Sequence, residues 1–141
     1  MLLSDNRLML FDNTTFDILD ENGTVDQNKL YSRTVIYNID ENNKTVKLDW
    51  QYGKERGKEI YSSFVSDVDY LGENHYLIDF GGQYKDDNGT AYDHIYTDDK
   101  IKNASNKTTT LIEILKVIFE AILYGNFNSY KAERKDIYQG M

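Results

Sequence analysis

Hydrophobic and polar positions alternate with a period close to two over much of this chain. Residues 34–39 and 45–50 are two runs rich in β-branched and aromatic side chains. The residues between them, 40–44, are Asp, Glu, Asn and Lys. Because Asn and Asp tolerate the left-handed backbone of tight reversals, this pattern predicts a β-hairpin.

A second hairpin is predicted further along the chain. Apolar and polar side chains alternate in residues 64–71 and 75–80, and the intervening residues 72–74 are Gly-Glu-Asn. Such alternation is typical of half-buried strands. A further strand is predicted at residues 8–11. Recurrent hairpins of this kind indicate an all-β meander.

Two later segments are less clearly patterned. Residues 83–110 are polar and loop-rich, with only short strand candidates such as 91–96. In residues 111–123, the spacing of Glu113, Lys116 and Glu120 places these polar side chains on one face of a helix. The Ile, Val and Phe content and the neighbouring strands favour strands instead. A short helix and a strand pair therefore both remain open for 111–123.

Composition and charge narrow the range of functions and partners that the chain can have. The chain has 141 residues, with 24 Asp and Glu against 16 Lys and Arg, for a net charge of -8. This is one domain's length, and the acidic excess disfavours nucleic acid and anionic membrane surfaces as partners. The apolar run 111–123 is shorter than the ~20 residues that cross a bilayer, so no membrane span is expected. Residues 1–7 show no signal-peptide pattern.

The sequence gives little support for a metal site or for catalysis by a histidine. The chain has no Cys, and its two histidines, His75 and His94, are far apart in sequence. A zinc site is therefore not expected. Acid-rich turns are predicted at 20–23, 40–44 and 86–89. None of them follows the ligand spacing of an EF-hand calcium loop. Each histidine can act as a base in principle, but a single His in an alternating strand is more often a hydrogen-bonded surface residue.

The densest group of charges and aromatics lies in residues 50–63. This stretch holds three cations, two carboxylates, two glycines and three aromatics between predicted strands. It can form an anion-binding loop if Lys54 or Arg56 points into a cavity. Alternatively, Gly53 and Gly57 permit a twisted connection in which the charges pair with one another. Chemistry alone favours the second interpretation.

Several short sequence motifs, taken in their order along the chain, closely resemble motifs of bacterial arylsulfate sulfotransferases, the PAPS-independent family. The resemblance is carried by LFDN at 10–13, YSR at 31–33, VIYNID at 35–40, WQYGKERG at 50–57, YS at 61–62, and YKAER with IY at 130–134 and 137–138. It implies an exported six-bladed β-propeller that transfers a sulfuryl group from a phenolic sulfate ester to a phenol acceptor. The implied mechanism uses a sulfo-histidine intermediate and no metal or nucleotide cofactor.

The resemblance also sets expectations for the fold. It makes residues 1–141 a single C-terminal portion of an arylsulfotransferase propeller, an all-β partial β-propeller of about two and a half to three blades. It favours a hairpin over a helix at 111–123, with a tight turn near Leu115 and Lys116. The full-length family member is expected to be periplasmic or secreted.

The site residues follow from the same comparison. The family's nucleophilic His would fall at or before Met1, and neither His75 nor His94 occupies a matching position, so no catalytic residue is expected here. The isolated chain is expected to be inactive or nearly so. The expected substrate-binding residues are Lys54, Arg56, Gly57, Tyr61, Ser62 and Ser63, with Arg33 a weaker candidate.

A rival hypothesis comes from a different functional class. The chain can be a non-catalytic, β-rich binding or assembly module derived from propeller blades. Open blades leave unpaired strand edges, and such edges favour association with a partner chain or with a second copy. A homo-oligomer is one outcome of this hypothesis.

Overall fold

The protein is described by a computed structural model that covers residues 1–14, 26–92, 104, 106–115, 119–125 and 129–133. Within these residues the chain is all-β, with two antiparallel sheets and one short 3-10 segment. The predictions for the acidic turn 20–23 and for His94 fall outside the described residues. No helix in the described part is long and apolar enough to cross a membrane.

The first sheet has three strands in the order β1-β2-β3. They are β1 (Arg7–Asp12), β2 (Arg33–Asp40) and β3 (Thr45–Tyr52). The turn between β2 and β3 is fixed by Asp40, whose Oδ1 accepts hydrogen bonds from the backbone N–H groups of Asn42 and Asn43 at 3.1 and 3.0 Å. The predicted strand at 8–11 and the first predicted hairpin are thus confirmed.

The second sheet has four strands in the order β4-β5-β6-β7. They are β4 (Ser66–Gly72), β5 (His75–Lys85), β6 (Asn106–Ile114) and β7 (Phe119–Tyr124). The predicted turn between β4 and β5 is confirmed, and Asn74 adopts the left-handed φ of 56° that such a turn requires. The predicted hairpin at 64–80 is therefore also correct.

The prediction of a helix at residues 111–123 is wrong for the residues of this segment that the structure describes. Residues 111–114 belong to β6 and residues 119–123 to β7, and the two strands pair with Glu113 opposite Phe119 and Ile112 opposite Glu120. Glu113 and Glu120 therefore face opposite sides of the sheet, although their spacing suits one helix face. The β-branched and aromatic content decides the structure here.

The segment predicted as loosely patterned, 83–110, has strand at both ends. Residues 83–85 complete β5 and residues 106–110 begin β6. The pairing shifts register between Phe80 and Gln83, where Gly81 and Gly82 lie. Asp86 Oδ1 closes the predicted turn 86–89 by accepting hydrogen bonds from the backbone N–H groups of Asn88 and Thr90.

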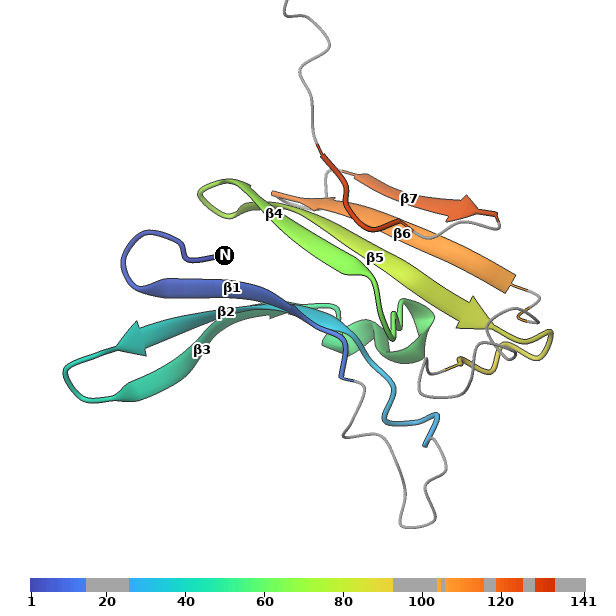
Figure 1. The fold of residues 1–141 in the computed structure, drawn as a ribbon, viewed down its shortest axis with the longest axis horizontal. Helices are drawn as coiled ribbons and strands as arrows, with labels where there is room; N and C mark the ends of the chain where they lie inside the picture. Colours follow the sequence, from blue (N-terminus) through green and yellow to red (C-terminus); the bar gives the residue numbers. More distant parts are fainter. Residues whose placement is uncertain (15–25, 93–103, 105, 116–118, 126–128, 134–141) are drawn as a thin grey trace, which may run out of the picture.

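One apolar core joins the two sheets. Strand β1 contacts β4, and Figure 1 shows the sheets side by side along these strands. The Trp50 ring of β3 stacks on Tyr76 of β5 with 4.6 Å between ring centroids, and Phe11 meets Phe80 edge-on at 5.1 Å. The buried members are Met9, Ile36, Ile60, Val68, Tyr76, Ile78, Phe80 and Ile112. Burial of each large side chain contributes about 1.5–3 kcal/mol.

The 3-10 segment η1 (Lys54–Glu59) follows β3 directly. Gly53 precedes it with a φ of 111°, and Gly57 interrupts it with a φ of 53°. Side chains rarely tolerate these backbone angles, which explains the two glycines of the sequence. After η1 the chain runs through a buried stretch, Ile60 to Ser63, to the start of β4. Both sheets are open-edged, and the described residues do not close into a ring.

Candidate functional site

The residues predicted to bind substrate fall into two groups. Lys54, Arg56 and Gly57 belong to η1, where they are exposed or half-buried. Tyr61, Ser62 and Ser63 follow η1 and are fully buried. Only Lys54 and Gly57 of the six lie at a pocket together with Tyr31.

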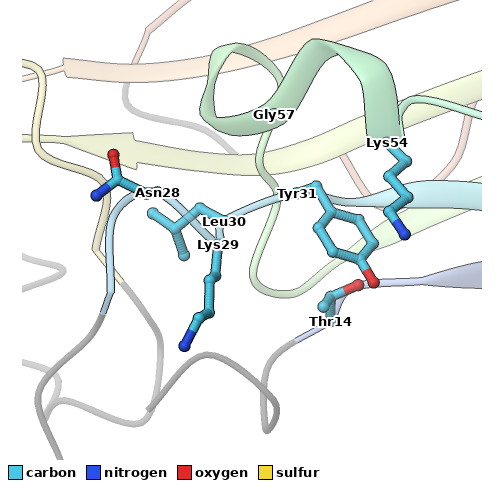
Figure 2. A pocket seen from close by; sticks show the side chains of 7 residues that line it. All are labelled: Thr14, Asn28, Lys29, Leu30, Tyr31, Lys54 and Gly57. Carbon is cyan, nitrogen blue, oxygen red and sulfur yellow. The ribbon is translucent and has the colours of Figure 1, made fainter. Parts of the chain in front are cut away.

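This pocket, the Lys54 pocket, forms where the chain enters β2 and leaves β3. Its volume is about 380 Å³. Antiparallel pairing places Thr34 opposite Tyr52, so the residues before β2 lie beside those after β3. The lining residues are Thr14, Asn28, Lys29, Leu30, Tyr31, Lys54 and Gly57. Figure 2 shows the Tyr31 ring between Lys54 and Thr14, with Asn28 and Lys29 at the other end.

Lys54 brings a positive charge to this pocket without a carboxylate partner in the described part of the chain. Its Nζ lies 5.1 Å from the centroid of the Tyr31 ring, a cation–π distance. The carboxylate next to it in sequence, Glu55, accepts instead from the backbone N–H of Gly53, at 3.1 Å to each oxygen. Lys54 is therefore available to an anionic ligand.

The other cations near the pocket already have partners. Arg33 Cζ lies 5.6 Å from the Tyr31 centroid, and its guanidinium donates to Asp12 and Gln51 at 2.9 Å each. Lys29 Nζ lies 3.4 Å from a carboxylate oxygen of Asp26. Within the described residues Tyr31 is thus flanked by two cations, of which Lys54 has no carboxylate partner there.

Arg56 pairs with carboxylates, as the second interpretation of residues 50–63 predicts. Its guanidinium pairs with Glu59 in η1 and donates to both carboxylate oxygens of Glu120 in β7, at 2.8 and 2.9 Å. The hydrogen bonds to Glu59 and Glu120 raise the pKa of Arg56 well above its usual range. The side chain ties η1 to the second sheet and does not line the Lys54 pocket.

Ser62 is the centre of a buried hydrogen-bond network. Its hydroxyl accepts from the backbone N–H of Gly82 at 2.8 Å, and its backbone N–H donates to Ser32 Oγ at 2.9 Å. Its carbonyl accepts from Asn13 Nδ2 at 2.6 Å. These bonds hold the starts of β2 and β4, the end of β1 and the middle of β5 together. Ser62 therefore serves in this structure to hold these segments in place.

Of the two histidines, only His75 lies in the described part of the chain. Its Nε2 is 2.6 Å from Oε1 of Glu113, across the β5–β6 pair. Both side chains are largely buried, with 16% and 8% of their surface exposed. No group of three or more residues that could hold a metal ion occurs among the described residues.

Sequence reasoning found Lys54 and Gly57 but not the other walls of their pocket. Tyr31 belonged to the segment YSR at 31–33, yet it lies more than twenty positions before Lys54 in the chain. The hairpin register was the available signal, because extending the pairing of β2 and β3 beyond the strand ends brings these residues together.

Comparisons with known proteins bear on this site. The family model described as Arylsulfotransferase (ASST) matches residues 1–124. The arylsulfate sulfotransferase AssT of Escherichia coli O6:H1 is 46% identical over 52 residues, and that of Lelliottia amnigena is 48% identical over 52 residues. Each match covers 37% of this chain and 9% of the relative. The chain thus spans only a small part of these relatives' length.

Proposed function

This chain belongs to the arylsulfotransferase (ASST) family, and we propose from that premise that it serves in sulfuryl transfer from a phenolic sulfate ester to a phenol. The observation that carries the proposal is the Lys54 ammonium, which lies at a pocket beside the Tyr31 ring without a carboxylate partner in the described chain. An ammonium donates strong hydrogen bonds to sulfate oxygens, and an aromatic ring packs against an aryl group.

The proposed chemistry runs in two half-reactions through a histidine. A histidine nitrogen attacks the sulfur, the bond from sulfur to the donor phenol oxygen breaks, and that oxygen takes up a proton. The acceptor phenol oxygen then attacks the same sulfur, the N–S bond breaks, and the acceptor gives up its proton. Lys54 would hold the non-bridging oxygens, where negative charge gathers in the transition state.

We assign the nucleophile to a histidine other than His75. The Nε2 of His75 is engaged by the Glu113 carboxylate at 2.6 Å, and the pair is largely buried between β5 and β6. A nucleophilic imidazole needs a nitrogen that can reach the substrate sulfur. His75 does not line the Lys54 pocket, and its contact with Glu113 suits a structural role.

The proposal extends to architecture and location. The three-stranded and four-stranded sheets would be successive blades of a partial propeller, which is supported by their antiparallel meander order and shared core. The whole enzyme would act in the periplasm or outside the cell, an expectation that rests on the family alone. A non-catalytic binding module is not favoured by the family match.

Binding of an aryl sulfate tests the role of Lys54. We expect isothermal titration of the 141-residue protein with para-nitrophenyl sulfate to show binding that Lys54→Met weakens roughly ten- to a hundredfold, the value of a charge-assisted hydrogen bond. Lys54→Arg should retain most of the affinity. Lys58→Met is the matched control, since Lys58 is an exposed cation of η1 away from the pocket. Equal binding by the Lys54→Met variant would refute the assignment.

Turnover tests the nucleophile separately. With para-nitrophenyl sulfate as donor and phenol as acceptor, we expect the isolated chain to bind the donor without sustained release of para-nitrophenol. Sustained release that His75→Gln abolishes would show that His75 is the nucleophile after all. Sustained release that survives His75→Gln would place the nucleophile elsewhere in this chain.

A further inference from the structure

Segment η1 carries Lys54 at its first position and Arg56 two residues later. We propose that Arg56 is a positioning residue for the aryl sulfate site: by joining η1 to β7 through Glu120, it holds the ammonium of Lys54 at its pocket. Arg56 itself does not line this pocket, so it acts on the ligand only through Lys54. The inference rests on the function proposed above for Lys54 and adds what keeps that side chain in place.

The backbone of η1 has little of its own to hold it in place. None of its six residues is buried, and a 3-10 segment has poorer hydrogen-bond geometry than an α-helix. Gly53 lies directly before η1 and Gly57 within it, and Figure 2 shows Gly57 on the same coil as Lys54. Glycine restricts the backbone less than any other residue. The position of Lys54 therefore depends on contacts that η1 makes with the rest of the molecule.

The Arg56 guanidinium makes several of these contacts. Its Nη1 and Nη2 donate to the two carboxylate oxygens of Glu120 at 2.9 and 2.8 Å, which makes a bidentate pair. The guanidinium also pairs with Glu59 at the end of η1, and its Nη1 donates to the hydroxyl of Tyr52 in β3 at 3.4 Å. One side chain thus joins the strand before η1, the last residue of η1 and β7.

The surroundings of this group favour a fixed arrangement. Only 18% of the Arg56 side-chain surface and 30% of that of Glu120 are exposed. Exposed ion pairs are usually weak, but bidentate pairs and networks of several charges are the exceptions. The planar fork of the guanidinium is needed here, because a lysine ammonium meets a carboxylate as a point charge. Lys85 adds a second tie, from its Nζ to the backbone carbonyl of Glu59 at 2.9 Å, but this tie acts at the far end of η1.

A fixed Lys54 has a direct consequence for affinity. A long side chain that is already held in its binding position loses less conformational entropy when the ligand arrives. Without the pair of Arg56 and Glu120, Lys54 has to be ordered at the moment of binding. Charge alone makes the opposite prediction for Glu120, because removal of a negative charge from the protein favours an anionic ligand. The sign of the effect therefore separates positioning from electrostatics.

Isothermal titration of the 141-residue protein with para-nitrophenyl sulfate tests the inference. We expect Glu120→Gln to weaken binding roughly three- to tenfold, as for one long side chain that must be ordered on binding. Arg56→Lys keeps the charge but loses the fork, and should weaken binding to a similar extent. Glu73→Gln is the matched control, since it removes the same charge from an exposed turn and should not weaken binding. In a Lys54→Met background, Glu120→Gln should have little further effect.

A second measurement needs no ligand. The NMR order parameter of the Lys54 backbone amide reports its motion on the picosecond-to-nanosecond timescale. We expect this order parameter to fall in Glu120→Gln and in Arg56→Lys, and to stay unchanged in Glu73→Gln. Urea denaturation of the same variants shows that each is folded at the temperature of the measurement.

Three results would overturn the inference. They are unchanged or tighter binding of para-nitrophenyl sulfate by Glu120→Gln, an effect of Glu120→Gln that is equally large in the Lys54→Met background, and an unchanged Lys54 order parameter in both variants. A different result would count against the proposed function instead. If the parent protein does not bind para-nitrophenyl sulfate while Glu120→Gln still lowers the Lys54 order parameter, the aryl sulfate site fails and the link from Arg56 to Lys54 stands.

Discussion

At the scale of single residues, neighbouring carboxylates decide what each cation of η1 does. Lys54 and Arg56 are two positions apart, and both were predicted to bind substrate. Arg56 is held by Glu59 and Glu120, whereas Glu55 accepts from the N–H of Gly53 and Lys54 has no carboxylate partner among the described residues. Both residues have a carboxylate nearby in the sequence, Glu55 for Lys54 and Glu59 for Arg56. Arg56 differs from Lys54 in its pairing with Glu120, which lies 64 positions from Arg56 in the sequence.

Asp79 gives a prediction about pH. It is fully buried in β5, where its Oδ2 accepts from Ser129 Oγ and its Oδ1 has no partner among the described residues. Burial raises the pKa of Asp79 from 3.8 to about 6. The folded state therefore holds this proton more tightly than the unfolded state, and its contribution to stability is lost as the pH rises through that range.

The variant Asp79→Asn removes this ionisation. We expect the free energy of unfolding of the variant, relative to the parent protein, to improve by about 2 kcal/mol between pH 4 and pH 7. Urea denaturation at a series of pH values measures the difference. Asp87→Asn, at an exposed turn position, is the matched control. A pH-independent difference for Asp79→Asn would mean that folding does not raise the pKa of Asp79.

At the scale of elements, hairpins were predictable and distant pairings were not. Local sequence signals predicted strands at 34–39, 45–50, 64–71 and 75–80, and the structure has strands at 33–40, 45–52, 66–72 and 75–85. The pairing of β5 with β6 joins Phe80 to Thr110 across residues of weak pattern. The same limit explains why Tyr31 was not placed beside Lys54. Residues 111–123 suited two periods, and their β-branched and aromatic content favours strands, which form where 111–114 pair with β5 and 119–123 pair with β6.

The start of η1 depends on a close backbone approach at Gly53. A Cβ there would lie 2.6 Å from the carbonyl oxygen of Ser32, and φ is 111°. Gly53→Ala therefore combines backbone strain with a clash against main chain that cannot rotate away. We expect it to lower the free energy of unfolding by about 2–4 kcal/mol. It should also weaken aryl sulfate binding, because Lys54 follows directly.

Gly89 provides the matched control for this prediction. Its φ is also positive, at 77°, but nothing lies within 4 Å of a Cβ built there. Gly89→Ala should cost only the strain of a left-handed residue, about 1–2 kcal/mol. Chemical denaturation of both variants measures the difference between strain alone and strain with a clash. Equal costs would show that the segment before β2 moves aside for the added methyl group.

At the scale of the whole molecule, the two sheets share their core. Trp50 belongs to the first sheet and stacks on Tyr76 of the second, and Phe11 and Phe80 meet in the same way. Ser62 adds polar ties between the sheets, through Ser32 at the start of β2 and Gly82 in β5. Neither sheet can lose its strands without exposing apolar surface of the other. The described part of the chain is therefore expected to unfold as one cooperative unit.

Trp50 makes this cooperativity measurable, because it is the single tryptophan of the chain and lies in the first sheet. Ile112 is fully buried in β6 of the second sheet. We expect Ile112→Ala to lower the free energy of unfolding by about 2–5 kcal/mol. The urea midpoint from Trp50 fluorescence should fall as far as the midpoint from far-UV circular dichroism. Leu123→Ala, at an exposed position of β7, should change both midpoints little. If Ile112→Ala shifts the dichroism curve while the Trp50 midpoint stays in place, the sheets unfold separately, and the shared core does not couple them.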